Sequence, residues 1–375
     1  MKNNFSKPKI VLGMSGGVDS SVCAYLLQKQ GYEVIGLFMQ NWDSYLNNDI
    51  QGHIKNDDKQ CNAQKDFNDA KAVADKLDIK IYRTEFIDKY WKQVFQYTLR
   101  EYKAGRTPNP DILCNKYIKF DEFISYAKKH FKCDKIAMGH YANVKHIGNK
   151  HFLMKAKDED KDQTYFLCWL SQEQLSHVEF PIGNIIKTTI RQIAKDNGLI
   201  NWSKKDSTGI CFVGERKFKN FLNNYLPYKK GKVIDILNNK VVGQHDGVMF
   251  FTYGQNKGLG LSGQTKKYFV CQKDVKHNIL FVCDEQHKEK YLSSQKCELV
   301  EFNWINGIPQ NKKVSVRFRH RQKLIDGVFT IIKDKVTLSY KPTLSITPGQ
   351  FAVIYQNDVC LGGGIVNSIV AKATN

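Results

Sequence analysis

The sequence predicts an α/β protein with an N-terminal doubly wound parallel sheet, a small mainly β central domain and a C-terminal antiparallel β-barrel or sandwich. In residues 1–150, short apolar runs alternate with segments of helical periodicity, the pattern of parallel strands joined by crossover helices. From about residue 205 onward, glycine becomes frequent and short β-rich runs replace this alternation. The 375 residues, 42% of them hydrophobic, are enough for two or three domains. We expect these domains at 1–205, 206–287 and 288–375.

The expected elements follow in chain order. Apolar runs predict buried strands at 10–12, 33–39, 79–83 and 135–138, and helical spacing predicts helices at 20–30, 66–77, 89–104 and around 120–127. Further β-rich runs lie at 232–235, 249–252, 267–270 and 279–282, and residues 290–375 hold at least five more strand candidates. Ligands of parallel sheets bind at the carboxyl ends of the strands. Residues 13–21, Met39 and residues 139–140 are therefore expected on one edge, where one adenosine nucleotide reaches all three.

The most informative stretch is Gly13-Met-Ser-Gly-Gly-Val-Asp-Ser-Ser21, between the first strand and the first helix. A glycine-rich turn at a helix start points unpaired backbone N–H groups at one spot, and the helix dipole adds to the attraction for anions. Gly16 and Gly17 let phosphate oxygens approach the backbone, and Asp19 offers a carboxylate to a Mg²⁺ bridging the phosphates. The pattern is neither Walker A nor Gly-x-Gly-x-x-Gly. It resembles the SGGxDS pyrophosphate loop of ATP pyrophosphatases; the alternative is an ordinary glycine turn with a Ser/Asp cap.

The charge balance predicts a polyanionic partner. The chain has 57 Lys and Arg against 37 Asp and Glu, a formal net charge of +20. Nucleic acid is the leading candidate for a protein this basic, although a lysine- and asparagine-rich genome explains some of the lysines. There is no apolar run of about 18 residues and no apolar core of a signal peptide at the start, so we expect a cytoplasmic protein with no membrane span.

The ten cysteines are scattered, and no C-x-x-C pair occurs. In a large chain without a secretory signal, this pattern favours reduced thiols and argues against a zinc ribbon or an iron–sulfur site. No metal site built from a cluster of protein side chains is therefore expected; a Mg²⁺ with ATP near Asp19 is the one metal predicted.

Two cysteines stand in segments that suggest chemistry. Two prolines at 108 and 110 break a helix, and Asp111 precedes Cys114 at the start of the next one, where a thiol pKa is lowered in a basic protein. Cys211 follows a polar Ser-Thr-Gly loop, with Lys204, Lys205 and Arg216 nearby to favour the thiolate. The spacing alone only suggests persulfide chemistry, and a buried inert thiol is the usual alternative for a single cysteine.

The chain resembles the tRNA-specific 2-thiouridylases nearly from end to end. The resembling segments occur in the family's order and comprise Gly13–Ser20, Phe38–Trp42, Thr107–Asn115, Met138–Ala142, Lys161–Gln163, Asp206–Phe212, Thr347–Gln350 and Cys360–Gly364. One departure is Asn256, in Tyr-Gly-Gln-Asn-Lys-Gly, where the family often has arginine. The loss of that arginine affects one surface or RNA contact rather than the catalytic set.

The resemblance implies an ATP pyrophosphatase (PP-loop, adenylating) domain at 1–205, a central tRNA-binding domain and a C-terminal β-barrel. The implied reaction adenylates O2 of the wobble uridine with ATP and then replaces that oxygen with sulfur from a cysteine persulfide.

The implied ATP-binding residues are Gly13, Met14, Ser15, Gly16, Gly17, Val18, Asp19, Ser20, Met39 and Gly139. Those that meet the target base are Asn109, Pro110 and Asp111, with Asp111 as acid/base. Cys211 carries the persulfide and Cys114 is its partner nucleophile. The tRNA contacts are His140, Lys161, Asp162, Gln163, Arg317, Phe318 and Gln350.

The implied partners are tRNA and a sulfur donor, either a cysteine desulfurase or a relay protein, and a monomer is the expected state. The basic run from Lys312 to Lys323, with Phe318 within it, also favours RNA contact over a merely solvated face. Two other enzymes remain as alternatives: an ATP pyrophosphatase that delivers nitrogen, and a 2-thiocytidine-type enzyme, whose expected C-x-x-C is missing. A catalytically inactive tRNA-binding protein is the alternative from another class. The remaining eight cysteines are expected to be structural.

Overall fold

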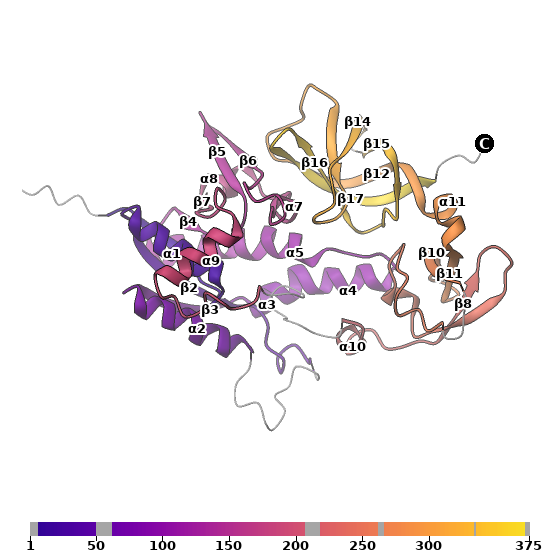
Figure 1. Cartoon of the computed structure of the whole chain (residues 1–375), viewed down its shortest axis with the longest axis horizontal. Helices are drawn as coiled ribbons and strands as arrows, with labels where there is room; N and C mark the ends of the chain where they lie inside the picture. Colours follow the sequence, from indigo (N-terminus) through magenta and orange to yellow (C-terminus); the bar gives the residue numbers. More distant parts are fainter. Residues whose placement is uncertain (1–6, 50–61, 207–217, 262–265, 334, 372–375) are drawn as a thin grey trace, which may run out of the picture.

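The computed structural model describes residues 7–49, 62–206, 218–261, 266–333 and 335–371. Figure 1 shows a layered α/β part made by the first half of the chain, with a barrel and a smaller β domain beside it. Cys61 and Cys211 lie outside the described residues. None of the helices within the described residues is both long and apolar enough to span a bilayer.

The N-terminal sheet is parallel throughout and has the strand order β3-β2-β1-β4-β7. Its strands are β1 (Lys9–Gly13), β2 (Glu33–Gln40), β3 (Lys80–Glu85), β4 (Ile136–Ala137) and β7 (Val178–Glu179). The chain order reverses at β1, because β2 pairs on one side of it and β4 on the other. The turn that follows β1 therefore lies at the switch point of the doubly wound sheet that the sequence predicts.

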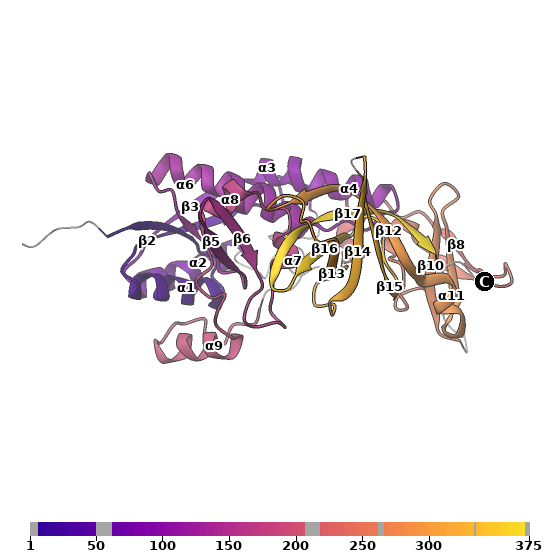
Figure 2. The ribbon, with the colours of Figure 1, turned by 90° about the horizontal axis from the view of Figure 1, so that it is seen from above.

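Both faces of β1 are buried, which explains its unbroken apolar run. Ile10 and Leu12 belong to one hydrophobic cluster and Val11 to another. Figure 2 shows helices on both sides of the sheet. One side carries α1 (Val18–Lys29), α2 (Asn62–Lys76) and α9 (Lys187–Asp196). The other carries α3 (Ile87–Tyr90), η2 (Trp91–Phe95), α4 (Gln96–Lys103), α5 (Pro110–Leu113), η3 (Cys114–Glu122) and α6 (Phe123–Phe131).

The central domain contains a four-stranded sheet of order β10-β11-β8-β9. Its elements are α10 (Phe218–Asn223), β8 (Gly231–Asp235), β9 (Val241–His245), η4 (Val248–Phe250), β10 (Tyr268–Asp274), β11 (Ile279–Asp284), η5 (Glu285–His287) and α11 (Lys288–Leu292). The strand predicted at 249–252 is wrong. Gly247, with φ +148°, leads into the 3₁₀ turn η4, and Phe250 and Phe251 are buried against the core without strand pairing.

The C-terminal domain is a closed six-stranded antiparallel barrel. Its strands are β12 (Ser293–Trp304), β13 (Lys313–Arg317), β14 (Ile325–Ile332), β15 (Lys335–Leu344), β16 (Phe351–Gln356) and β17 (Val359–Ala371). They follow the order β12-β15-β14-β13-β16-β17, and pairing of β12 with β17 closes the ring. The domain is therefore a barrel and not a sandwich, because the closed ring of strands has no free edge.

A hairpin from the first half of the chain extends the barrel sheet. It consists of β5 (Asn143–Ile147) and β6 (Lys150–Met154), and β6 pairs with the start of β17. The short elements α7 (Thr164–Leu167) and α8 (Gln172–Ser176) follow it. The first and third domains therefore share one sheet, which the sequence did not predict.

A buried ion pair ties the same two domains together. Arg317 Nη1 donates to Asp162 Oδ2 at 3.0 Å, with side chains only 9% and 1% exposed. Asp162 also accepts hydrogen bonds from the Thr164 hydroxyl and from the backbone N–H of Ala156. These contacts compensate for removing the carboxylate from water.

Replacing Arg317 with methionine should destabilise the protein by about 3–5 kcal/mol, because it leaves a buried carboxylate without its cation. The matched control is Lys341→Met, since Lys341 pairs with Asp326 at the surface and both side chains are more than 70% exposed. That control should cost about 1 kcal/mol or less. Urea unfolding of the full chain measures both; equal costs for the two variants would contradict the prediction.

Candidate functional site

The turn after β1 has the geometry of an anion-binding loop. Gly13 ends β1, Gly17 is the N-cap of α1, and Gly16 between them has φ +75°. A Cβ atom on residue 16 would lie only 2.3 Å from the carbonyl oxygen of Asp66, so only glycine fits there. Ser20 Oγ accepts from the N–H of Ser15 at 3.2 Å and donates to the Gly17 carbonyl at 3.0 Å. These bonds fix the turn at the positive end of the helix dipole.

Met14 and Val18 are buried at 2% and 3% exposure, so they support the turn from below rather than line its surface.

The two other predicted nucleotide-binding segments lie at the same edge of the sheet. Met39 stands near the carboxyl end of β2 and is partly buried. Gly139 follows β4, and a Cβ atom there would come within 3.1 Å of the Ser20 nitrogen. The geometry fits a nucleotide spread over three strand ends, and ATP binding by these residues stays a prediction.

Asn201, which sequence reasoning missed, and Lys204, which it placed near Cys211, hold the glycine turn from the side. Asn201 Nδ2 donates to the Gly16 carbonyl at 3.0 Å and to Ser21 Oγ at 2.8 Å. Lys204 Nζ lies 3.3 Å from the same carbonyl and also pairs with Asp66 and Asp69. Neither residue belongs to the loop motif, and both lie far from it along the chain.

Asp19, in the first turn of α1, is held by two donors that the sequence also did not reveal. Tyr141 donates its hydroxyl hydrogen to Asp19 Oδ1 at 2.8 Å, and Lys187 Nζ lies 2.8 Å from both carboxylate oxygens. Burial, followed by the nearby Asp19 charge, raises the pKa of Tyr141 well above its usual value. The Tyr141 hydroxyl therefore stays protonated and remains a hydrogen-bond donor to Asp19.

A Mg²⁺ ion fits this place only together with phosphates. Asp19 supplies the type of oxygen that Mg²⁺ prefers, but both oxygens already face an ammonium group. Across the parts of the chain that the structure describes, no group of three or more His, Cys, Asp or Glu side chains forms a metal-binding cluster. An ion here would therefore take most of its ligands from the nucleotide and water.

The segment predicted to meet the target base begins a helix. Asn109 is the N-cap of α5 and its side chain accepts from the Ile112 N–H, while Pro110 occupies the first helical position. Asp111 is partly buried in this first turn. Burial first, and then the charge of Asp111, raise the pKa of Tyr102. Asp111 lies in the first turn of α5, where a carboxylate interacts favourably with the helix dipole.

The loop before α5 is held by all three domains. Gln350 of the barrel donates from Nε2 to the carbonyls of Thr107 and Pro108 at 3.0 and 3.2 Å. Lys273 of the central domain donates to the Gly105 carbonyl at 2.9 Å. Burial lowers the pKa of Lys273 to about 8. Gln350, predicted to contact tRNA, therefore has a positioning role in this structure.

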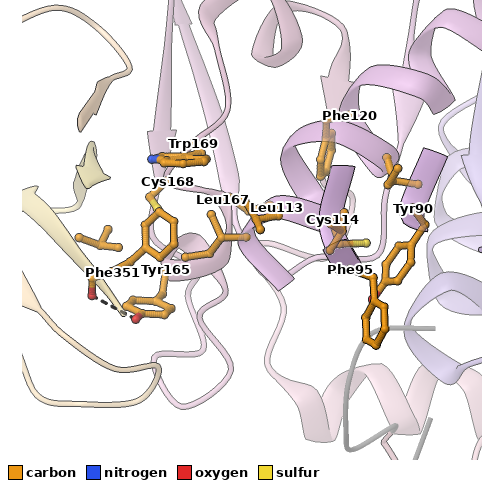
Figure 3. Close-up of a cluster of buried hydrophobic side chains, with 14 of the residues drawn as sticks. Tyr90, Phe95, Leu113, Cys114, Phe120, Tyr165, Leu167, Cys168, Trp169 and Phe351 are labelled. Atoms are coloured by element: carbon orange, nitrogen blue, oxygen red, sulfur yellow. Dashed lines mark hydrogen bonds between the residues drawn. The ribbon is translucent and has the colours of Figure 1, made fainter. Parts of the chain in front are cut away.

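Cys114 begins η3 and is fully buried. Figure 3 shows it among aromatic side chains that include Tyr90, Phe95 and Phe120. Cys211, its predicted partner, lies outside the described residues, so the meeting of the two thiols stays a prediction. The helical run begins at Pro110, about one turn before Cys114, which is close to the start predicted from the sequence.

Most of the residues predicted to contact tRNA are internal. His140 is 8% exposed between Phe120 and Phe180, and burial lowers its pKa well below the usual value. Phe318 is 2% exposed, and its backbone carbonyl accepts from Tyr165.

The remaining predicted tRNA residues lie around Asp162. Asp162 and Arg317 form the buried pair described above, and Gln163 Oε1 accepts from the Tyr141 N–H at 2.9 Å. Lys161 and Gln163 are partly exposed, and Lys161, whose side chain is 28% exposed, pairs with Asp206. Direct tRNA contact by this set stays a prediction, and in this conformation Lys161 is its most accessible cation.

A doubly wound sheet with a glycine-rich anion-binding turn at its switch point defines a nucleotide-binding α/β domain, here followed by two β domains. Family models agree in order: "tRNA methyl transferase HUP domain" matches residues 8–215, "tRNA methyl transferase PRC-barrel domain" 219–284 and "Aminomethyltransferase beta-barrel domain" 294–366. The chain belongs to the tRNA-specific 2-thiouridylase family, which confirms the resemblance.

Its relatives cover nearly the whole chain. The protein named tRNA-specific 2-thiouridylase MnmA from Ureaplasma urealyticum serovar 10 is 51% identical over 366 residues, which is 96% of each chain. Proteins of the same name from Mycoplasma mycoides subsp. mycoides SC and Malacoplasma penetrans are 51% and 52% identical, covering 97% and 95% of this chain and 100% and 97% of their own.

Gly16→Ala should weaken ATP binding at least about tenfold, a loss of about 1.4 kcal/mol, because the new methyl group displaces the turn from Asp66. Gly31→Ala is the matched control: Gly31 ends the same helical segment with φ +91°, but nothing lies within 4 Å of its added Cβ. The control should lose about 1–2 kcal/mol of folding stability and keep its ATP affinity. Isothermal titration calorimetry compares them, and unchanged affinity in Gly16→Ala would sink the assignment of this turn.

Proposed function

We propose that this protein is an ATP-dependent tRNA 2-thiouridylase that adenylates O2 of the wobble uridine and replaces that oxygen with sulfur. The observation that carries the proposal is the near full-length identity of about 50% to relatives of that name, in a chain that keeps a glycine-rich anion-binding turn at the switch point. The net charge of +20 agrees with a nucleic-acid substrate.

ATP is proposed to bind with its phosphates at the turn from Gly13 to Ser20. The N–H groups at the start of α1 point toward this place, and Lys187 and Lys204 add two positive charges beside it. The lack of a side chain at Gly16 and Gly139 keeps the loop tightly packed against its neighbours. Mg²⁺, bound with the phosphates near Asp19, would neutralise charge on the departing pyrophosphate.

Adenylation solves a leaving-group problem. A uridine carbonyl oxygen leaves poorly, whereas O2 joined to AMP departs as a phosphate ester. We propose that the outer sulfur of a Cys211 persulfide attacks C2 and expels AMP, which leaves the base joined to Cys211 through a disulfide. The Cys114 thiolate then attacks the Cys211 sulfur, which frees the 2-thiouridine and leaves a Cys114–Cys211 disulfide. An external thiol reductant supplies the two electrons that restore both thiols.

Asp111 is proposed to accept the persulfide proton beside the target base, which Asn109 and Pro110 help to hold. Cys114 is fully buried under Tyr90, Phe95 and Phe120, so its attack requires these side chains to move. The wobble base must also leave its stack, at a cost of a few kcal/mol by analogy with base flipping.

Contacts to the tRNA backbone offset that cost. The exposed cations of the basic run from Lys312 to Lys323 are suited to phosphates, and they comprise Lys312, Lys313, Arg319, Arg321 and Lys323. Lys161, His140, Gln163, Phe318 and Gln350 are proposed to act near the anticodon loop, directly or by holding the segments that touch it. A protein sulfur donor and a monomeric enzyme complete the proposal.

Replacing either Cys211 or Cys114 with alanine should abolish 2-thiouridine formation while tRNA-dependent pyrophosphate release continues, since adenylation needs neither thiol. The matched control is Cys133→Ser, because Cys133 donates to the backbone carbonyls of Lys9 and Lys135 and serine can do the same. Mass spectrometry of digested tRNA measures the thiolated base, and a phosphate-release assay measures the first step.

Full thiolation by both alanine variants would refute the persulfide mechanism. AMP formation without tRNA would instead favour an enzyme that delivers nitrogen to a small substrate. Tight tRNA binding without any AMP release from the unmodified protein would favour the catalytically inactive binding protein.

A further inference from the structure

A cavity lies where the helical layer of the first domain meets the barrel. It has a volume of about 260 Å³, and its lining residues are Gln93, Tyr97, Arg100, Leu113, Tyr117, Trp169 and Glu301. None of them belongs to the residues predicted to hold ATP, the target base or tRNA. The volume is just below the range of about 300–1,000 Å³ that is typical of sites for drug-sized ligands, so the cavity suits a ligand with one ring system.

Two helical runs each present one face to this cavity. Gln93, Tyr97 and Arg100 follow one another at intervals of four and three residues along η2 and α4. Tyr117 comes four residues after Leu113, where α5 continues into η3. Residues at these intervals share one side of a helix, so the chain directs all five side chains to the same place.

Trp169 forms a fixed wall of the cavity. It is 6% exposed, its Nε1 donates to the Gly363 carbonyl at 3.0 Å, and its ring packs edge-on against Phe351 with centroids 4.9 Å apart (Figure 3). With Tyr97 and Tyr117, three aromatic rings line the cavity. Such a lining favours a flat ligand that stacks on the rings.

Two opposite charges line the same cavity without neutralising each other. Across the part of the chain that the structure describes, neither Arg100 nor Glu301 takes part in an ion pair. The Arg100 guanidinium lies 5.9 Å from the centre of the Tyr97 ring, and burial followed by the charge of Glu301 raises the pKa of Tyr117. Gln93 Oε1 is buried and accepts no hydrogen bond from the described residues. A matching ligand therefore brings N–H donors for the two acceptors and oxygen or nitrogen acceptors for the guanidinium.

The backbone of Glu301 departs from a regular strand at this point. Its φ is +50°, in the left-handed region that few residues other than glycine adopt. From Val300 to Asn303, β12 advances three residues while its partner β17 advances two, from Ile365 to Gly363, which defines a bulge. Bulges redirect side chains, and strain of this kind is found at ligand sites. The bulge thus gives an independent reason to regard the Glu301 carboxylate as part of a binding site.

We propose that this cavity binds a guanine base, stacked on the aromatic rings, with its N1–H and N2–H groups donating to Glu301 and its O6 and N7 accepting from Arg100. Arginine commonly pairs with O6 and N7 of guanine, and proteins read unstacked bases by such edge contacts. Among the four RNA bases, only guanine carries two adjacent N–H groups beside two adjacent acceptors. The second hydrogen of the amino group is available to Gln93 Oε1. The base comes from a free guanine nucleotide or from an unstacked guanosine of an RNA, and the recognition chemistry is the same.

The first experiment titrates the full chain with guanosine 5′-monophosphate (GMP) by isothermal titration calorimetry, with α,β-methylene-ATP present to occupy the glycine turn. GMP should bind, and the adenosine and cytidine monophosphates should bind at least about tenfold more weakly. Inosine 5′-monophosphate, which lacks the amino group, should also bind more weakly than GMP.

Glu301→Gln should weaken GMP binding about tenfold or more, because the amide removes the charge and one of the two acceptor oxygens. The matched control is Glu298→Gln. Glu298 lies on the same strand, pairs with Lys335 and is not part of the cavity lining, so this variant should bind GMP like the unmodified protein.

The second experiment tests RNA as the source of the base. Kethoxal modifies N1 and N2 of unpaired guanine, so a guanosine of a tRNA transcript held by Glu301 should be protected in the complex and reactive again with Glu301→Gln. Protection without GMP binding assigns the site to RNA, and GMP binding without protection assigns it to a free nucleotide. Equal binding of all the monophosphates without any Glu301-dependent protection, or insensitivity of both measurements to Glu301→Gln, would refute the guanine site. The thiolation reaction is unaffected by that result, because the cysteine variants test it separately.

Discussion

The burial of β1 on both faces is the constraint on which the rest of the structure depends. Ile10 and Leu12 pack on one helical layer and Val11 on the other, so the strand cannot shift without disturbing both layers. Because β2 and β4 lie on opposite sides of it, the turn after Gly13 opens where the two crossover directions diverge. The close fit of Gly16 against Asp66 and of Gly139 against Ser20 then leaves the turn one conformation.

The two other domains hold segments of the first one in place. The barrel reaches the loop before α5 through Gln350, and the central domain reaches it through Lys273. The Asp162–Arg317 pair fixes the barrel to the chain beside Lys161. Residues that the family pattern associates with tRNA, such as Asp162 and Gln350, therefore support the packing between domains in this structure.

The regular parts of this fold could be predicted from the sequence, since apolar runs and helical spacing reflect burial directly. The strand predicted at 249–252 was wrong because Phe250 and Phe251 are buried by packing without strand pairing. The hairpin of β5 and β6 was not predicted because polar and apolar residues are mixed along both strands, and because its pairing with β17 depends on a contact distant along the chain. Lys187 and Asn201 were missed for a similar reason: no motif marks them, and only the fold brings them to the turn. Lys204 was expected beside Cys211, and its contact with the turn was not predicted.

The shared sheet has a consequence for biosynthesis. β6 is made early, but its partner β17 is the last strand of the chain, and the same strand also closes the barrel on β12. Contacts of such long sequence separation form late, so the edge of β6 stays unpaired during synthesis until β17 has been made.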